Sequence, residues 1–257
     1  MIEALQIAAT GMQAQQRQVE TISNNMANMA TPGFKRSKVS FVDLVSRGAE
    51  PQAGSDTVAT AASRGLGVSV NGVSLVMDAG DVRRSDDPAD LMIAGAGYLE
   101  VLLPDGGTAF SRGGHLRVGT DGQITTAEGY PLKSALVLPA GAKDFVVASD
   151  GTVAARDVQG RDQVVGQMAL VRFNDEDGLE ALGDRLYRAT ARSGEPISGR
   201  AAEQGFGVFR QGFQEASNVK LGDEVVGLML AQRAYEANAK VLQASDEMLA
   251  MVNNLRK

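Results

Sequence analysis

The stretch VKLGDEVVGLMLAQRAYEANAKVLQASDEMLAMVNNLRK, residues 219–257, decides the fold of the C-terminal part of the chain. It contains no proline and only two glycines, so little in it interrupts a helix. Large side chains recur every seven residues along it, at Leu221, Leu228, Tyr235, Leu242 and Leu249. This spacing predicts a helix that packs on another helix in the manner of a coiled coil, with Asn218 or Asp223 capping its start.

A second set of apolar side chains follows the first along the same segment: Val226, Leu230, Ala234, Val241, Met248 and Val252. The predicted helix therefore carries an apolar surface wider than one helix partner would cover.

The N-terminal segment, residues 1–30, has a similar pattern. Apolar residues step by three and four, and those expected in the seam include Leu5, Met12, Val19 and Ile22. The sequence Thr31-Pro-Gly33 ends the helix, because proline disfavours helical geometry in the residue before it. The segment holds only three charged residues, Glu3, Arg17 and Glu20, which suits burial against other subunits better than permanent solvation. An ordinary helix inside a globular domain is the alternative.

Between the two predicted helices the chain is rich in breakers, and all seven prolines lie there. Residues 31–65 are expected to form an extended connector or arm, because 47–65 are small and polar with little to bury. Short strands between turn signals predict a β-rich domain, meander or barrel-like, over 66–200, followed by a return connector at 201–218. The best strands are 98–103, 123–126 and 164–173. The predicted fold class is α+β, with residues 1–30 and 219–257 paired as a helical domain.

Composition excludes several classes of function. The chain of 257 residues has no cysteine and one histidine, which rules out disulfides, thiol catalysis and multi-histidine metal sites. The net charge of −6 argues against a nucleic-acid partner or an anionic membrane surface. The sequence contains no apolar run long enough to span a bilayer, and Met1–Thr10 lacks the basic and apolar regions of a cleavable secretory signal.

No catalytic motif stands out. The run Asp86-Asp87-Pro88-Ala89-Asp90 lacks the ligand spacing of a calcium loop, so a solvated turn is the favoured interpretation. His115 is interpreted as a surface or cross-strand residue rather than a base. No catalytic residue, metal ligand or cofactor is therefore expected.

Three asparagines, Asn24, Asn25 and Asn28, lie near the end of the first predicted helix although asparagine is a poor helix former. Either the helix frays there, or their amides bond between chains or cap the exit into Thr31-Pro-Gly33. The sequence leaves both alternatives open.

Several motifs, in order along the whole chain, resemble those of the bacterial flagellar rod and hook family of axial proteins. They are Ser23-Asn-Asn-Met-Ala-Asn28, Thr31-Pro-Gly-Phe-Lys35, the run from Leu91 to Arg112, Gly212-Phe-Gln-Glu-Ala-Ser-Asn-Val219 and Gln232-Arg-Ala-Tyr-Glu236. The opening Met1–Met12 is most similar to that of the distal rod members, and the proximal rod members are the alternative within the family.

The resemblance implies a structural subunit, not an enzyme, that self-assembles into a helical tube with the paired helices innermost. It implies export through the flagellar type III apparatus without cleavage, and Phe41 and Val45 resemble the family's export segment. The implied partners are further copies of the chain, the proximal rod proteins, the hook protein and the outer ring bushing, in a basal body that spans the periplasm. A coiled-coil-stalk binding module that does not polymerise is the alternative from a different class.

Overall fold

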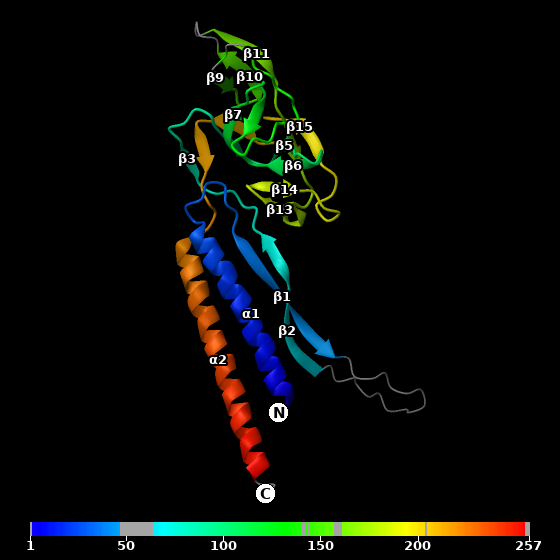
Figure 1. The fold of residues 1–257 in the computed structure, drawn as a ribbon, viewed down its shortest axis with the longest axis vertical. Coiled ribbons are helices and arrows are strands. Elements are labelled where there is room, and N and C mark those ends of the chain that lie inside the picture. The colour runs from blue at the N-terminus through cyan, green and yellow to red at the C-terminus, as the bar shows by residue number, and fades with distance from the viewer. Residues whose placement is uncertain are drawn as a thin grey trace, which may run out of the picture. The chain divides into compact units, whose positions relative to one another are not determined.

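A computed structural model describes residues 2–46, 64–139, 142, 144–156, 161–203 and 205–254. The fold is α+β, as predicted, with one helix near each terminus and many strands between them (Figure 1). The chain divides into two compact units. The helical unit comprises Met1–Ala27, Ser37–Leu75 and Lys220–Lys257, and the β unit comprises Asn28–Arg36 and Val76–Val219.

Two long helices form the centre of the helical unit. Helix α1 spans Ile2–Ala27 and helix α2 spans Leu221–Asn254, and the two lie side by side (Figure 1). The predicted cap at Asn218 is wrong, because this side chain bonds to the backbone of other segments three residues before the helix begins. Asp223 lies in the first turn of α2, where its negative charge complements the helix dipole.

A long β-hairpin completes the helical unit. Strand β1 (Ser37–Ser46) pairs antiparallel with β2 (Arg64–Leu75), and both contact α1. Gly67 approaches α1 so closely that a β-carbon there would lie 2.2 Å from the Thr10 hydroxyl oxygen. The sequence assigned residues 66–75 to the β-rich domain, whereas pairing with β1 places them with the helices. Most of the expected arm, residues 47–63, lies outside the described residues.

The β unit is built from short antiparallel strands arranged in open sheets. The orders are β11-β10-β9, β13-β14-β6-β5, β16-β4-β7-β8, β12-β15 and β17-β3, so no barrel closes among the strands that the structure describes. The bounds are β3 Val82–Arg84, β4 Asp90–Ala94, β5 Leu99–Leu102, β6 Thr108–Ser111, β7 Gly113–Val118, β8 Ile124–Thr126, β9 Asp144–Val147, β10 Thr152–Arg156, β11 Asp162–Gln167, β12 Ala169–Arg172, the short 3₁₀ helix η1 Glu176–Gly178, β13 Glu180–Gly183, β14 Leu186–Arg188, β15 Ile197–Arg200, β16 Val208–Gln211 and β17 Phe213–Glu215.

A large hydrophobic core draws on most of these sheets. Val101, Val153 and Leu170 are fully buried members of it. The three strands predicted from sequence correspond to β5, to β8, and to β11 with β12. Alternation of apolar and polar residues predicts such strands because one face of each packs on the core.

One glycine in the β unit marks an especially close approach of two backbones. A β-carbon at Gly80 would lie 1.9 Å from the carbonyl oxygen of Ala216, a distance that no side chain tolerates. The segments around residues 80 and 216 therefore pack directly against each other through their main chains.

We expect Gly80→Ala to destabilise the β unit by about 3 kcal/mol, because the added methyl forces the two backbones apart. The measurement is urea unfolding followed by tyrosine fluorescence, since Tyr98, Tyr130 and Tyr187 all lie in the β unit. The control is Gly222→Ala, where nothing lies within 4 Å of the added methyl. An unchanged unfolding midpoint for Gly80→Ala would contradict the close approach.

Candidate assembly surfaces

The contact between α1 and α2 is lined by small and polar residues rather than by leucine. On α2 the positions Glu224, Ala231, Asn238 and Ser245 recur every seven residues, and all but the half-buried Asn238 are buried. A β-carbon at Gly11 of α1 would lie 2.7 Å from the Asn238 amide nitrogen. Small residues let the two helix backbones come close, so long side chains are displaced to the flanks of the contact.

The predicted leucine heptad accordingly lies beside the centre of this contact. Leu228, Leu242 and Leu249 are half-buried, whereas Leu221 and Tyr235 are exposed in the single chain. On α1, Ile22 is buried and packs near Gly227, and the other expected seam residues, Leu5, Met12 and Val19, are half-buried.

The second apolar set on α2 forms a stripe that the described residues of the chain leave largely exposed. The exposed members of this stripe are Val226, Leu230, Val241, Met248 and Val252, whose exposed fractions run from 44% to 66%. Ala234 continues the stripe and is half-buried. From residue 226 to residue 252 the stripe is about 39 Å long at 1.5 Å per residue. None of these side chains carries a charge, so the stripe is suited to packing against another apolar surface.

The hairpin exposes apolar side chains as well. Phe41 and Val45, which resemble the family's export segment, are 42% and 47% exposed on β1. Val42 and Leu44 between them are also exposed. Phe41 and Val45 lie on one face of β1 with Asp43 between them, and Val42 and Leu44 lie on the other, so both faces of this strand expose apolar side chains.

The asparagines have separate roles. Asn25 is buried; its amide oxygen accepts a hydrogen bond from the Ser37 amide at 2.9 Å, and its nitrogen donates to Glu224 Oε2 at 3.2 Å. It thus joins α1, β1 and α2 within one chain. Asn28 lies just after α1, and its side-chain and main-chain oxygens accept bonds from Thr31. Asn28 therefore stabilises the exit turn, and Asn24 is exposed on α1.

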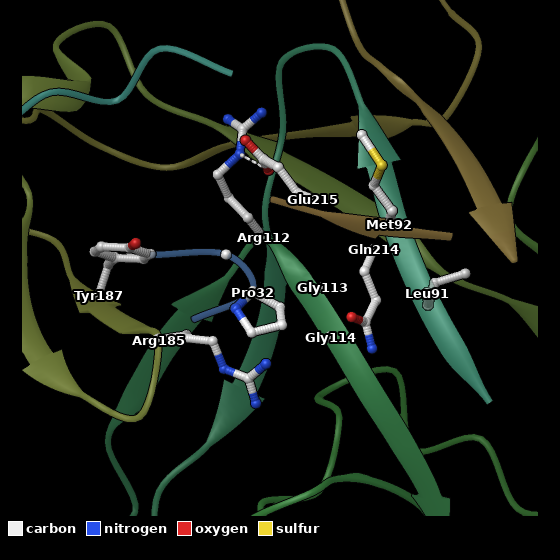
Figure 2. Close-up of a pocket in the computed structure, with 11 residues that line it drawn as sticks. Pro32, Leu91, Met92, Arg112, Gly113, Gly114, Arg185, Tyr187, Gln214 and Glu215 are labelled. Carbon is white, nitrogen blue, oxygen red and sulfur yellow. Dashed lines mark ion pairs between the residues drawn. The ribbon is translucent and has the colours of Figure 1, made fainter. Parts of the chain in front are cut away.

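The β unit contains a buried charge network that the sequence did not reveal. Lys35 Nζ lies 2.7 Å from Glu215 Oε1, with both side chains almost completely buried. Arg112 Nε lies 3.6 Å from the other carboxylate oxygen of Glu215, and Tyr98 donates to Glu176 Oε2 at 2.9 Å. Figure 2 shows Arg112 and Glu215 together at one side of a cavity of about 30 Å³ that Pro32 and Tyr187 also line.

Burial shifts the titration of these groups. It lowers the pKa of the Lys35 ammonium, although the Glu215 carboxylate opposes this shift. Burial would also lower the pKa of Arg112, but Glu215, Tyr98 and Glu176 together outweigh burial, so the pKa is raised. Burial raises the pKa of the Tyr187 hydroxyl to about 12 and raises that of Tyr98 further.

Asp90 and His115, which the sequence singled out as candidates for a site, are joined in a hydrogen-bonded cluster. Asp90 is buried, so the solvated turn is wrong for this residue. Its carboxylate accepts hydrogen bonds from Ser85 and from Gln214, and it lies 3.1 Å from His115 Nδ1 on the neighbouring strand β7. His115 is therefore a cross-strand partner of Asp90. Within the described ranges no group of three acidic or histidine side chains could hold a metal ion.

An exposed apolar stripe along a terminal helix is typical of a surface that another protein chain covers. None of the described helices has the length and apolar character needed to cross a membrane.

Comparison with known proteins agrees with this interpretation. Three family models match: "Flagella basal body rod protein" over residues 5–35, "Flagellar hook protein FlgE/F/G D1 domain" over 92–155 and "Flagellar basal body rod FlgEFG protein C-terminal" over 210–255. The flagellar basal-body rod protein FlgG of Caulobacter vibrioides is 41% identical over 99% of this chain and 100% of its own length. FlgG of Buchnera aphidicola subsp. Acyrthosiphon pisum is 38% identical over 99% and 100%, and FlgG of Bacillus subtilis is 34% identical over 100% of both chains.

The chain belongs to the FlgG family of flagellar basal-body rod proteins. Its place is the flagellar basal body, and its role is that of a structural protein of the rod.

The raised tyrosine pKa values predict a loss of stability in alkali. An unfolded tyrosine ionises near pH 10, whereas Tyr187 in the folded chain ionises only near pH 12. Between these values the unfolded state binds fewer protons than the folded state, so the free energy of unfolding falls as the pH rises from 10 to 12. Below pH 10 this contribution is fully present.

The measurement is tyrosinate absorbance at increasing pH, which no tryptophan obscures because the chain has none. We expect Tyr187→Phe to reduce only the late part of the absorbance rise, and to weaken the pH dependence of stability above pH 10. A variant that instead loses amplitude near pH 10 would show that Tyr187 is not shielded from water.

Proposed function

We propose that the chain is a subunit of the distal rod that polymerises into a helical tube between the proximal rod and the hook. The exposed apolar stripe on α2 carries this proposal. In the tube each subunit buries its stripe against neighbouring copies, with the paired helices innermost and the β unit outside. The role is structural rather than catalytic.

A helical polymer needs contacts that do not close on themselves, so each subunit must offer two different surfaces. The stripe on α2 is one surface, and the apolar face of the hairpin around Phe41 and Val45 is a second. Both belong to the helical unit, which agrees with assembly through this unit. The half-buried flanks of the helix pair, including Leu228 and Leu242, extend the surface available to neighbours.

The same family relation supports the remaining partners. Proximal rod proteins and the hook protein contact the two ends of the tube, and the outer ring bushing surrounds it. Delivery is through the flagellar type III export apparatus without cleavage, and β1 with Phe41 and Val45 supplies the export segment. The basal body then carries the rod across the periplasm.

We expect Leu230→Asp to abolish polymerisation while the single chain stays folded. Leu230 is 66% exposed, so the substitution removes little from the fold. In the assembly it would bury an unpaired carboxylate, at a cost of several kcal/mol per contact. Sedimentation and electron microscopy measure assembly, and swimming of a complemented deletion strain measures function.

Gln243→Asp is the matched control, because it adds the same charge to an exposed position of α2 outside the stripe. It should assemble as the unaltered chain does. If Leu230→Asp polymerises normally, the stripe is not an assembly surface. If the unaltered chain forms a dimer that never elongates, the alternative of a non-polymerising stalk module is correct.

A further inference from the structure

Three segments of the β unit meet at the buried charge network. They are the leading segment, Asn28–Arg36, the segment 76–80, and the closing segment, residues 213–219. The leading and closing segments are separated by almost the whole length of the β unit in sequence. Neither has an apolar side chain among the buried core residues. Their apolar side chains, such as Phe34 and Phe213, are at most half-buried, so polar contacts have a large share in holding them in place.

Lys35, which lies in the leading segment, bonds to both of the other segments. Its ammonium donates to the carbonyl oxygen of Asp78 at 2.7 Å and to that of Met77 at 3.4 Å, besides Glu215 at 2.7 Å. These three acceptors match the three donors of an ammonium group. The Lys35 ammonium can therefore keep the leading segment in position only while these three acceptors stay in place.

Glu215 is the matching group on the closing segment. The oxygen that accepts from Lys35 also accepts from the Gly80 amide at 2.7 Å, and the second oxygen faces Arg112 at 3.6 Å. Glu215 thus offsets the charge of two buried cations. Arg112 in turn lies 3.8 Å from Glu176 and over the ring of Tyr98, so it has partners besides Glu215.

Hydrogen bonds donated by three main-chain amides connect the leading and closing segments directly. The Gly33 amide donates to the Glu215 carbonyl oxygen at 2.7 Å, and the Arg36 amide donates to Asn218 Oδ1 at 2.7 Å. The Asn218 amide donates to the carbonyl oxygen of Phe34 at 3.4 Å. These three amides report whether the two segments are joined.

From these contacts we infer that Lys35 and Glu215 form a latch that orders the leading segment only when the closing segment is in place. Lys35 has no other carboxylate within bonding distance among the described residues, so without Glu215 its buried charge would have only carbonyl oxygens as direct partners. The first turn after α1 and the last turn before α2 then become ordered together. The inference concerns the β unit of one chain and holds whether or not the chain polymerises.

The latch is predicted to be asymmetric. Loss of Lys35 leaves Glu215 with Arg112 and the Gly80 amide, whereas loss of the Glu215 charge leaves both Lys35 and Arg112 facing a neutral group. Removing the carboxylate charge should therefore open the junction more than removing the ammonium does.

The test is amide hydrogen exchange on the full, dilute chain. For Glu215→Gln we expect exchange of the Gly33, Arg36 and Asn218 amides to accelerate about 100-fold, and for Lys35→Met about 10-fold. The double variant should exchange more slowly than the product of the two effects predicts, because no buried ammonium then remains at position 35. Amides of β5, Leu99–Leu102, should keep their protection in all three variants.

Arg156→Met and Asp162→Leu are the matched controls, since this ion pair joins β10 and β11 with both partners about half exposed. They should leave the three junction amides unchanged. The latch is overturned if those amides exchange in Glu215→Gln as in the unaltered chain, or if Lys35→Met has the larger effect. It is also overturned if β5 loses protection together with the junction, because the pair then holds the whole unit rather than one segment.

Discussion

The constraint on which this structure depends is that the chain passes between its two units four times. The helical unit draws on three separate stretches of sequence and the β unit on two. Closing such long loops costs conformational entropy before any contact is gained, so the stretches need strong local ties. Polar side chains that bond to the backbone supply these ties: the buried Asn25 in the helical unit, and the buried Lys35 and the half-buried Asn218 in the β unit.

Polar ties suit these places because the segments that they hold have few side chains to bury. A backbone amide or carbonyl that leaves water needs a partner, and one asparagine can satisfy a donor and an acceptor at once. Asn218 accepts from the Arg36 amide and donates to the carbonyl oxygens of Val76 and Asp78. The motifs with Asn25, Lys35 and Asn218 thus have a physical explanation within a single chain.

The sequence predicted the features that depend on local periodicity. Both helices and the α+β class follow from apolar spacing and from the placement of proline, and the stripe with Leu230 is visible in the same way. The centre of the helix contact was not predicted, because Ala231 and Ser245 give no apolar signal and the close approach depends on Gly11 of the other helix. The pairing of Lys35 with Glu215 could not be predicted either. Its partners are 180 residues apart, and a lone charge in a sequence does not indicate burial.

Because the stripe on α2 is exposed in the single chain, the stability of the helical unit would depend on the concentration of subunits that can cover it. Val226, Leu230 and Met248 are exposed in the single chain. In the proposed polymer, the free energy of burying them would contribute to stability in proportion to the logarithm of the subunit concentration. The β unit, whose core is complete within one chain, has no such term. On heating, the melting temperature of the helical unit would therefore depend on the protein concentration, whereas that of the β unit would not.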